Sequence, residues 1–350
     1  DWSQVFAAIL TGVLAIRGIP EPLALFISVL FAAYPLMIRR LETPFRPQAP
    51  LDPQGNAFVM EAARKTWCFF DETMVSAHHF LPPSALQVDP AAGMTDETSA
   101  QAIGYGLLAC VSACMLGILS PEEMAQRLSR QCDTLEALPK WHGMLYAHYG
   151  LADLVPVDPV QIRTEDCGLV CAALMCAAQM LRAQMHRLSE NHQALPARLD
   201  ELAGAMDFAP LMDRSAGLLV NGVSLPEEAP FGHIDSLASS SLPACFLAIL
   251  RRAAPPSMLE SMMPLAVKAN GYTTFLSAGG SMAEYLAPTL LLPYPPLCAL
   301  ERSLHGAISA QIRHNTDGVF GVSSCMAWGF TTGIRYRPVH AGLNALALHQ

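Results

Sequence analysis

The sequence predicts an all-α fold, and an α/α toroid of the six-hairpin type, complete or incomplete, fits it. Apolar residues recur at helical spacing along most of the chain, strand signals are scarce, and long polar loops separate the predicted helices. A toroid gathers such loops at one end of a ring of helix hairpins, where sites form. An irregular helical bundle would give the same pattern, so periodicity leaves both arrangements open.

The N-terminus predicts an apolar, membrane-associated segment over residues 1–41. Val5–Ile16 and Leu23–Ile38 carry no charge, and Arg39-Arg40 follows the second run. The second run is short for a bilayer span, and a buried core helix is the alternative. If it spans, the two arginines place the rest of the chain on the cytoplasmic side of an inner membrane. Because the chain begins with Asp1 instead of Met, we expect a segment of a longer protein or a processed product.

A Pro-rich polar stretch, residues 42–56, predicts a linker, and residues 57–350 then form one helical domain. One helix start is marked by Ser120 as N-cap, Pro121 in the first turn and Glu123 completing a capping box. The predicted helices are 57–70, 98–118, 121–138, 167–188, 197–206, 241–253, 257–269, 281–291 and 296–313, with a short hairpin at 329–337.

Composition narrows the classes of function. The 350 residues are 52% hydrophobic and 15% charged, with a net charge of −9 and 21 Lys and Arg residues. Because no basic cluster of the kind that binds phosphates is present, we expect no nucleic-acid partner. The ten cysteines lack zinc-ligand spacing, which predicts free thiols in a reducing compartment, no metal site and no cofactor.

Carboxylates in the helix-joining loops are the candidate reactive groups. Asp166 precedes an apolar helix and could be its N-cap, and Asp235 lies ahead of three serines, Ser239 to Ser241. Glu284 stands within an apolar helix, where a carboxylate has to be paired or face a cavity. No nucleophile elbow, phosphate-binding loop, dinucleotide fingerprint or zinc-protease motif is present.

These loops, taken in order from Phe58 to Leu346, resemble the glycoamylase-like domain of bacterial cyclic β-1,2-glucan synthases, which is related to β-1,2-glucan hydrolases. No single piece is specific, but many pieces in the same order make coincidence a poor explanation. The matching pieces are ARKTWCFF (63–70), LPPSALQVDP (81–90), TSAQAIG (98–104), TEDCG (164–168), DSLASSS (235–241), GGSMAEYLAPTLLLPYP (279–295), QIRH (311–314), GVSS (321–324) and YRPVHAGL (336–343).

The resemblance implies an α/α toroid with a glucan cleft, associated with the transglycosylation that closes glucan rings. It also implies neighbouring transferase and phosphorylase-like domains in a longer membrane protein. The family has its two catalytic glutamates where this chain has Ser240 and Ser324. A serine hydroxyl stays protonated near neutral pH and cannot replace a carboxylate as acid or base. We therefore expect a degenerate domain with a structural or glucan-handling role.

Two alternatives stay open at this stage. The chain could be an active hydrolase or transglycosylase that uses relocated carboxylates, Asp166, Asp235 and Glu284, or an interaction scaffold that contacts no sugar. The polar and aromatic residues that survive from the family pattern are the expected glucan contacts. They are Gln87, Asp89, Tyr149, Asp166, Asp235, Glu284 and Tyr285.

Overall fold

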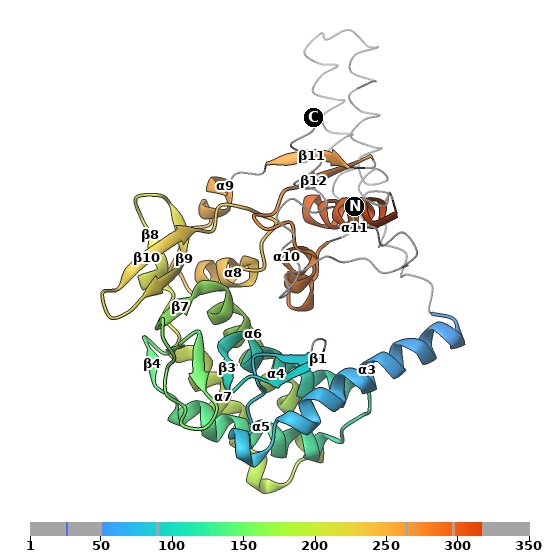
Figure 1. The fold of residues 1–350 in the computed structure, drawn as a ribbon, viewed down its shortest axis with the longest axis vertical. Coiled ribbons are helices and arrows are strands. Elements are labelled where there is room, and N and C mark those ends of the chain that lie inside the picture. The colour runs from blue at the N-terminus through green and yellow to red at the C-terminus, as the bar shows by residue number, and fades with distance from the viewer. Residues whose placement is uncertain are drawn as a thin grey trace, which may run out of the picture. The chain divides into compact units, whose positions relative to one another are not determined.

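The computed structural model describes residues 26, 51–88, 91–262, 265–269, 271–295 and 298–316 (Figure 1). Two compact units divide the chain, Asp1–Pro53 and Gln54–Gln350. Of the predicted membrane segment 1–41 only Phe26 is described, and the predicted hairpin 329–337 lies outside the described residues. Among the helices with described bounds, the first along the chain begins at Pro53, inside the range predicted as linker.

Helices dominate the second unit and follow most of the predicted ranges. The helices are α3 (Pro53–Thr73), α4 (Ala100–Met115), α5 (Pro121–Ala137), α6 (Thr164–Ala183), α7 (Leu195–Ala205), α8 (Leu242–Leu250), α9 (Met258–Ser261), α10 (Met282–Leu286) and α11 (Ala299–Thr316). The helix predicted over 257–269 is wrong, because α9 ends at Ser261 and a strand occupies Ala266–Ala269. The sequences of α9 (MLES) and β11 (AVKA) each mix apolar and polar residues over four positions, which is too short for periodicity to separate a helix from a strand.

The domain is rich in helices, as predicted, but it also contains short strands that an all-α fold does not include. The strands are β1 (Leu86–Val88), β2 (Ala91–Met94), β3 (Glu97–Ser99), β4 (Lys140–Trp141), β5 (Met144–Leu145), β6 (His148–Gly150), β7 (Gln161–Arg163), β8 (Met212–Asp213), β9 (Leu218–Ser224), β10 (Ala229–His233), β11 (Ala266–Ala269) and β12 (Tyr272–Phe275). In the four-stranded sheet, β9 pairs with β7, β8 and β10, and the other sheets have two strands each. Most strands are too short to show an alternating apolar and polar pattern in the sequence. The longest strand, β9, does not alternate between buried and exposed residues.

The core centres on α6, which packs against α4, α7 and α8, while α5 contacts α4 and α7 (Figure 1). Among the described residues, α6 is the one helix long and apolar enough to cross a membrane by length and composition. Its Leu174, Ala177 and Leu181 are almost completely buried against its neighbours. Core packing therefore accounts for its apolar character.

Local signals set two helix starts. The predicted capping box of α5 is confirmed: Ser120 Oγ accepts a hydrogen bond from Glu123 N at 3.2 Å, and Glu123 Oε2 accepts one from Ser120 N at 2.8 Å. At the start of α4, Ser99 Oγ accepts a hydrogen bond from Ala102 N. Each cap satisfies backbone N–H groups that the first helical turn leaves without partners.

Candidate functional site

The N-terminal ends of α4, α6 and α8 meet at one place in the fold. A Cβ added to Gly104 of α4 would lie 2.7 Å from Leu169 Cγ of α6. A Cβ added to Gly168 of α6 would lie 2.5 Å from the Cβ of Ala244 of α8. All four residues belong to the first two turns of their helices, so the three helices begin side by side. The loops in front of these helices therefore share one region.

The loop in front of α8 is also tied to the turn in front of α10. Ser236 Oγ donates a hydrogen bond of 2.7 Å to Leu276 O, and Ala238 forms a parallel bridge with Ser277. The start of α10 therefore joins the same region. Its Glu284 closes a capping box with Ser281, and Glu284 Oε1 also accepts a hydrogen bond of 3.0 Å from Gly279 N.

Asp166 lies in the first turn of α6 and is 6% exposed. Burial and then the neighbouring Glu165 charge raise the pKa of its carboxyl, the Arg163 charge lowers it, and together they bring it to about 7. The described part of the chain supplies no hydrogen-bond partner for this carboxyl. The predicted N-cap role is wrong, because Arg163 is the N-cap and makes no side-chain cap bond. The first turn of α6 thus holds a buried carboxyl with a raised pKa.

Glu165 is the functional candidate that sequence reasoning missed. Burial raises the pKa of its carboxyl, and the Glu284 charge raises it further. The Ser240 hydroxyl, which acts as a hydrogen-bond partner of Glu165, lowers this pKa, as does the Arg163 charge. The position that holds a glutamate in the resembled family thus has a carboxyl beside it from another helix. The signal was the acidic pair Glu165-Asp166, but sequence does not show that it faces Ser240.

Two further side chains belong to this region. Tyr105 of α4 has its pKa raised by burial and by the charges of Glu165 and Asp166. His148 of β6 has its pKa lowered by burial and by the Arg163 charge, against an opposing effect of Glu97. Because β3 and β6 pair through Ser99 and His148, this histidine lies next to the start of α4. The site therefore combines carboxyls, a phenol and an imidazole.

The remaining predicted glucan contacts separate into two groups. Tyr149 and Tyr285 are buried, with their hydroxyls donating to Pro139 O at 2.8 Å and to Phe275 O at 2.9 Å. Their structural roles leave no surface for a sugar, and the prediction that they contact glucan does not fit their positions. Asp235 is exposed, and Gln87 is half-buried in β1. Asp89 and Ser324 lie outside the described residues.

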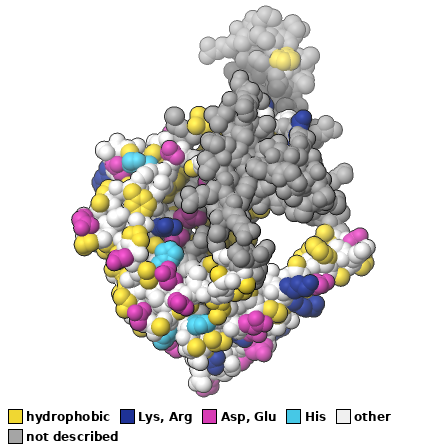
Figure 2. All heavy atoms as spheres, viewed as in Figure 1, with side chains coloured by type: hydrophobic (Ala, Val, Ile, Leu, Met, Phe, Trp, Pro, Cys, Tyr) yellow, Lys and Arg dark blue, Asp and Glu magenta, His cyan; other side chains and the backbone are white. Residues whose placement is uncertain are grey.

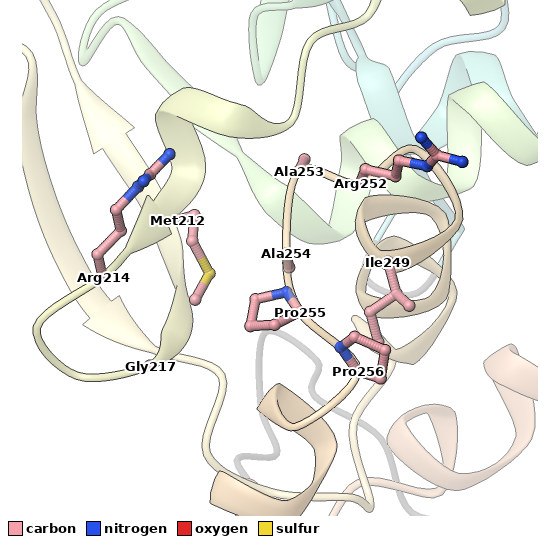
Figure 3. Close-up of a pocket in the computed structure, with 9 residues that line it drawn as sticks. All are labelled: Met212, Arg214, Gly217, Ile249, Arg252, Ala253, Ala254, Pro255 and Pro256. Atoms are coloured by element: carbon pink, nitrogen blue, oxygen red, sulfur yellow. The ribbon is translucent and has the colours of Figure 1, made fainter.

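A pocket of about 590 Å³ lies at the opposite end of α8 from Ser240 (Figure 3). Ile249 and Arg252 line it from the end of α8, and Met212 and Arg214 line it from the β8 side. Figure 3 shows the Arg214 and Arg252 side chains on opposite sides of the pocket. On the face shown in Figure 2, Lys and Arg side chains are scattered among acidic and apolar ones. No group of His, Cys, Asp and Glu residues suited to a metal ion occurs among the residues searched, which are the described ones.

Sequence comparison gives one informative relative, and no family model matches the chain. Over 110 residues the chain is 32% identical to the cyclic β-(1,2)-glucan synthase NdvB of Rhizobium meliloti. The alignment covers 31% of this chain and 4% of the synthase. The chain therefore corresponds to a small part of that protein's length.

Solved structures share the fold at low sequence identity. The endo-β-1,2-glucanase from Chitinophaga pinensis, in complex with sophorotriose and glucose, has a TM-score of 0.67 and 17% identity, covering 82% of this chain and 75% of its own. The β-1,2-glucanase from Parabacteroides distasonis has a TM-score of 0.64 and 13% identity, covering 81% of this chain and 45% of its own. The endo-β-1,2-glucanase from Talaromyces funiculosus, in complex with sophorose, has a TM-score of 0.56 and 12% identity, covering 74% of this chain and 64% of its own. The predicted resemblance is confirmed: this chain is a helix-rich domain with the glycoamylase-like fold, similar in sequence to a cyclic β-1,2-glucan synthase and in structure to β-1,2-glucanases.

Proposed function

We propose that this chain is the glycoamylase-like domain of a cyclic-β-1,2-glucan-synthase-like protein and that it binds a β-1,2-glucan chain. The binding site is the region where α4, α6 and α8 begin. The observation that carries this proposal is the convergence of Glu165, Asp166 and Ser240 at that region, in a fold shared with β-1,2-glucanases. In the proposed architecture these helices belong to the inner ring of an α/α toroid, whose loops at this end form the glucan cleft.

The domain does not use the two-glutamate chemistry of the resembled family. Ser240 and Ser324 stand at the two glutamate positions, and a hydroxyl neither donates nor accepts a proton as a carboxyl does near neutral pH. In this respect the domain is degenerate, and its primary role is to hold or guide a glucan chain. Of the predicted relocated set, Glu284 is engaged in a helix cap and Asp235 is exposed, so these two do not form a pair with Asp166 by themselves.

The proposal includes a cellular setting for this role. Residues 5–38 anchor the protein in the inner membrane, and Arg39-Arg40 places the domain on the cytoplasmic side. The glucan comes from a transferase domain of the same longer protein, which also contains a phosphorylase-like domain. The similarity to a synthase of which the alignment covers 4% supports this assignment to a larger protein.

The test is direct binding. Linear β-1,2-gluco-oligosaccharides of one length are titrated into the chain by calorimetry, with β-1,4-linked oligosaccharides of the same length as the control. We expect saturable binding of the β-1,2-linked ligand and at least about tenfold weaker binding of the control. Equal binding of both ligands, or binding of neither, would contradict the proposal, and binding of neither would favour a scaffold that contacts no sugar.

A further inference from the structure

The pocket at the end of α8 is separate from the proposed glucan site and has the size of a small-molecule site. Its volume is about 590 Å³, within the range of about 300–1,000 Å³ that such sites occupy. Ile249 lines it from the last turn of α8, whereas Ser240 precedes the first turn of the same helix. Apart from two arginines, the lining residues carry no polar side chain: they are Met212, Gly217, Ile249, Ala253, Ala254, Pro255 and Pro256. The pocket therefore offers an apolar surface with positive charge beside it.

One wall of the pocket is fixed by the way in which α8 ends. Arg252 N donates a hydrogen bond to Ile249 O at 3.0 Å. Ala253 N and Ala254 N both donate to Ala248 O, at 2.8 and 3.1 Å. The first two of these bonds close the helix in a Schellman motif, and Ala254 is only 5% exposed. Because backbone bonds and burial hold this wall in place, a ligand binds there without having to order it.

The other wall is the turn between β8 and β9, which carries Arg214. Gly217 N donates to Asp213 O at 2.9 Å and closes this turn. Figure 3 shows the Arg214 side chain extending beside Met212, on the same side of the pocket. Arg252 lines the far side, and in this view its guanidinium is turned away from Met212. Of the two arginines, Arg214 is therefore the one placed to meet a ligand that rests on Met212.

The Arg214 guanidinium has no anionic partner in the part of the chain that the structure describes. The adjacent Asp213 carboxylate is engaged elsewhere. Its Oδ1 atom accepts hydrogen bonds from Ser215 N at 2.8 Å and Ser215 Oγ at 2.6 Å, and its Oδ2 atom lies 2.9 Å from His233 Nε2. A guanidinium presents its N–H donors in a planar fork that matches a carboxylate or a phosphate. Arg214 therefore supplies the pocket with donors for one anionic group.

We propose that this pocket binds a small amphipathic anion. The apolar body of the ligand packs against Met212, Ile249 and the segment 253–256, and its carboxylate or phosphate pairs with Arg214. An unsubstituted β-1,2-glucan carries no anionic group, so this pocket and the region where α4, α6 and α8 begin recognise different chemistry. The site is an addition to the proposed glucan binding and does not depend on it.

Three naphthalene probes separate the two parts of the recognition. 1-Naphthyl phosphate and 1-naphthoate each join the same apolar body to one anionic group, and 1-naphthol carries no charge at neutral pH. Calorimetry with the full chain should give saturable binding, with at least one anion bound at least about tenfold more tightly than 1-naphthol, because hydrogen bonds to a charged group are the strong ones. The anion that binds more tightly identifies the natural ligand as a phosphate ester or a carboxylate.

Arg214→Met keeps an apolar side chain and removes the donors. It should weaken binding of the preferred anion by at least about tenfold and leave the affinity for 1-naphthol within about twofold. The matched control is Arg187→Met, at an exposed arginine of the 3₁₀ helix η2 (Met185–Arg187) that does not line the pocket. It should leave all three affinities unchanged. Met212→Ala removes part of the apolar wall instead and should weaken all three probes by similar factors.

Four results would overturn the proposal. They are an anion preference that persists in Arg214→Met, equal binding of anions and 1-naphthol by the unmodified chain, no binding of any probe, and a loss in Arg187→Met as large as in Arg214→Met. The last of these would mean that the preference reflects the overall charge of the chain. None of these results bears on glucan binding, so the two proposals fail separately.

Discussion

Gly168 of α6 lies against the backbone of Ala244 of α8, so that an added Cβ would be 2.6 Å from Ala244 N and 2.7 Å from Ala244 Cα. This contact sets how closely the starts of α6 and α8 approach. Glu165 lies three residues before Gly168, and Ser240 lies four residues before Ala244, so both stand near this contact. The close packing of these two helix starts therefore depends on the missing side chain of Gly168.

Gly168→Ala tests this contact. The new Cβ would meet backbone atoms, which cannot rotate away, so we expect a loss of about 1–3 kcal/mol in the free energy of unfolding. Gly204→Ala on α7 is the matched control, because a Cβ there meets nothing within 4 Å. The control substitution favours the helix and should leave stability unchanged or raise it by up to about 1 kcal/mol. Urea denaturation measures both, and equal effects of the two substitutions would contradict the contact.

Tyr149→Phe tests the structural role of a buried phenol. Tyr149 Oη accepts a hydrogen bond from Tyr146 N at 2.9 Å and donates one to Pro139 O at 2.8 Å. Removing it leaves two backbone groups without this partner, and we expect a loss of about 1–3 kcal/mol in unfolding free energy with no change in glucan affinity. Tyr146→Phe, with a hydroxyl that has no partner in the described structure, is the control. A large loss of glucan affinity in Tyr149→Phe with unchanged stability would restore the predicted sugar contact.

Arg251→Met tests the link between the ends of α7 and α8. The Arg251 guanidinium donates through Nη1 to Ala203 O and Met206 O, both at 2.8 Å, and through Nη2 to Cys171 Sγ at 3.0 Å. Loss of these charged donors should lower the free energy of unfolding by about 2–4 kcal/mol. Arg252→Met, next to it and exposed, should change stability by less than about 0.5 kcal/mol. Similar losses of stability in both variants would contradict a stabilising role of the Arg251 hydrogen bonds.

Asp166→Asn tests the buried carboxyl through the pH dependence of stability. The folded-state pKa is raised from the ordinary value of 3.8 to about 7, so the unfolded chain releases this proton at lower pH than the folded chain does. The free energy of unfolding of the unmodified chain therefore falls as pH rises from about 4 to about 7 and is level above. Over this window, Asp166→Asn should gain up to about 4 kcal/mol relative to the unmodified chain. Denaturation at pH 5 and pH 8 checks this, and a difference that does not change with pH would contradict it.

The sequence by itself determined most helices and the resemblance. Apolar spacing located α3 to α8 and α11. The side of a helix that faces a core carries an apolar residue every three to four positions, and this pattern is visible in the local sequence. Ser120, Pro121 and Glu123 located the start of α5 for a similarly local reason. The order of loop sequences carried the resemblance to glucan synthases, which the similarity to NdvB confirms.

Only the tertiary structure decided which polar side chains meet. Short strands such as β3 and β6 pair although they lie far apart in the sequence, so no local sequence pattern predicts their pairing. Tyr149 is buried by that pairing, Glu284 is bound to its own helix start, and Glu165 faces Ser240. Helix periodicity shows which side of a helix is buried but not which element packs against it. A site depends on such contacts between elements. The carboxyl beside Ser240 could therefore be recognised only once α6 and α8 were packed together.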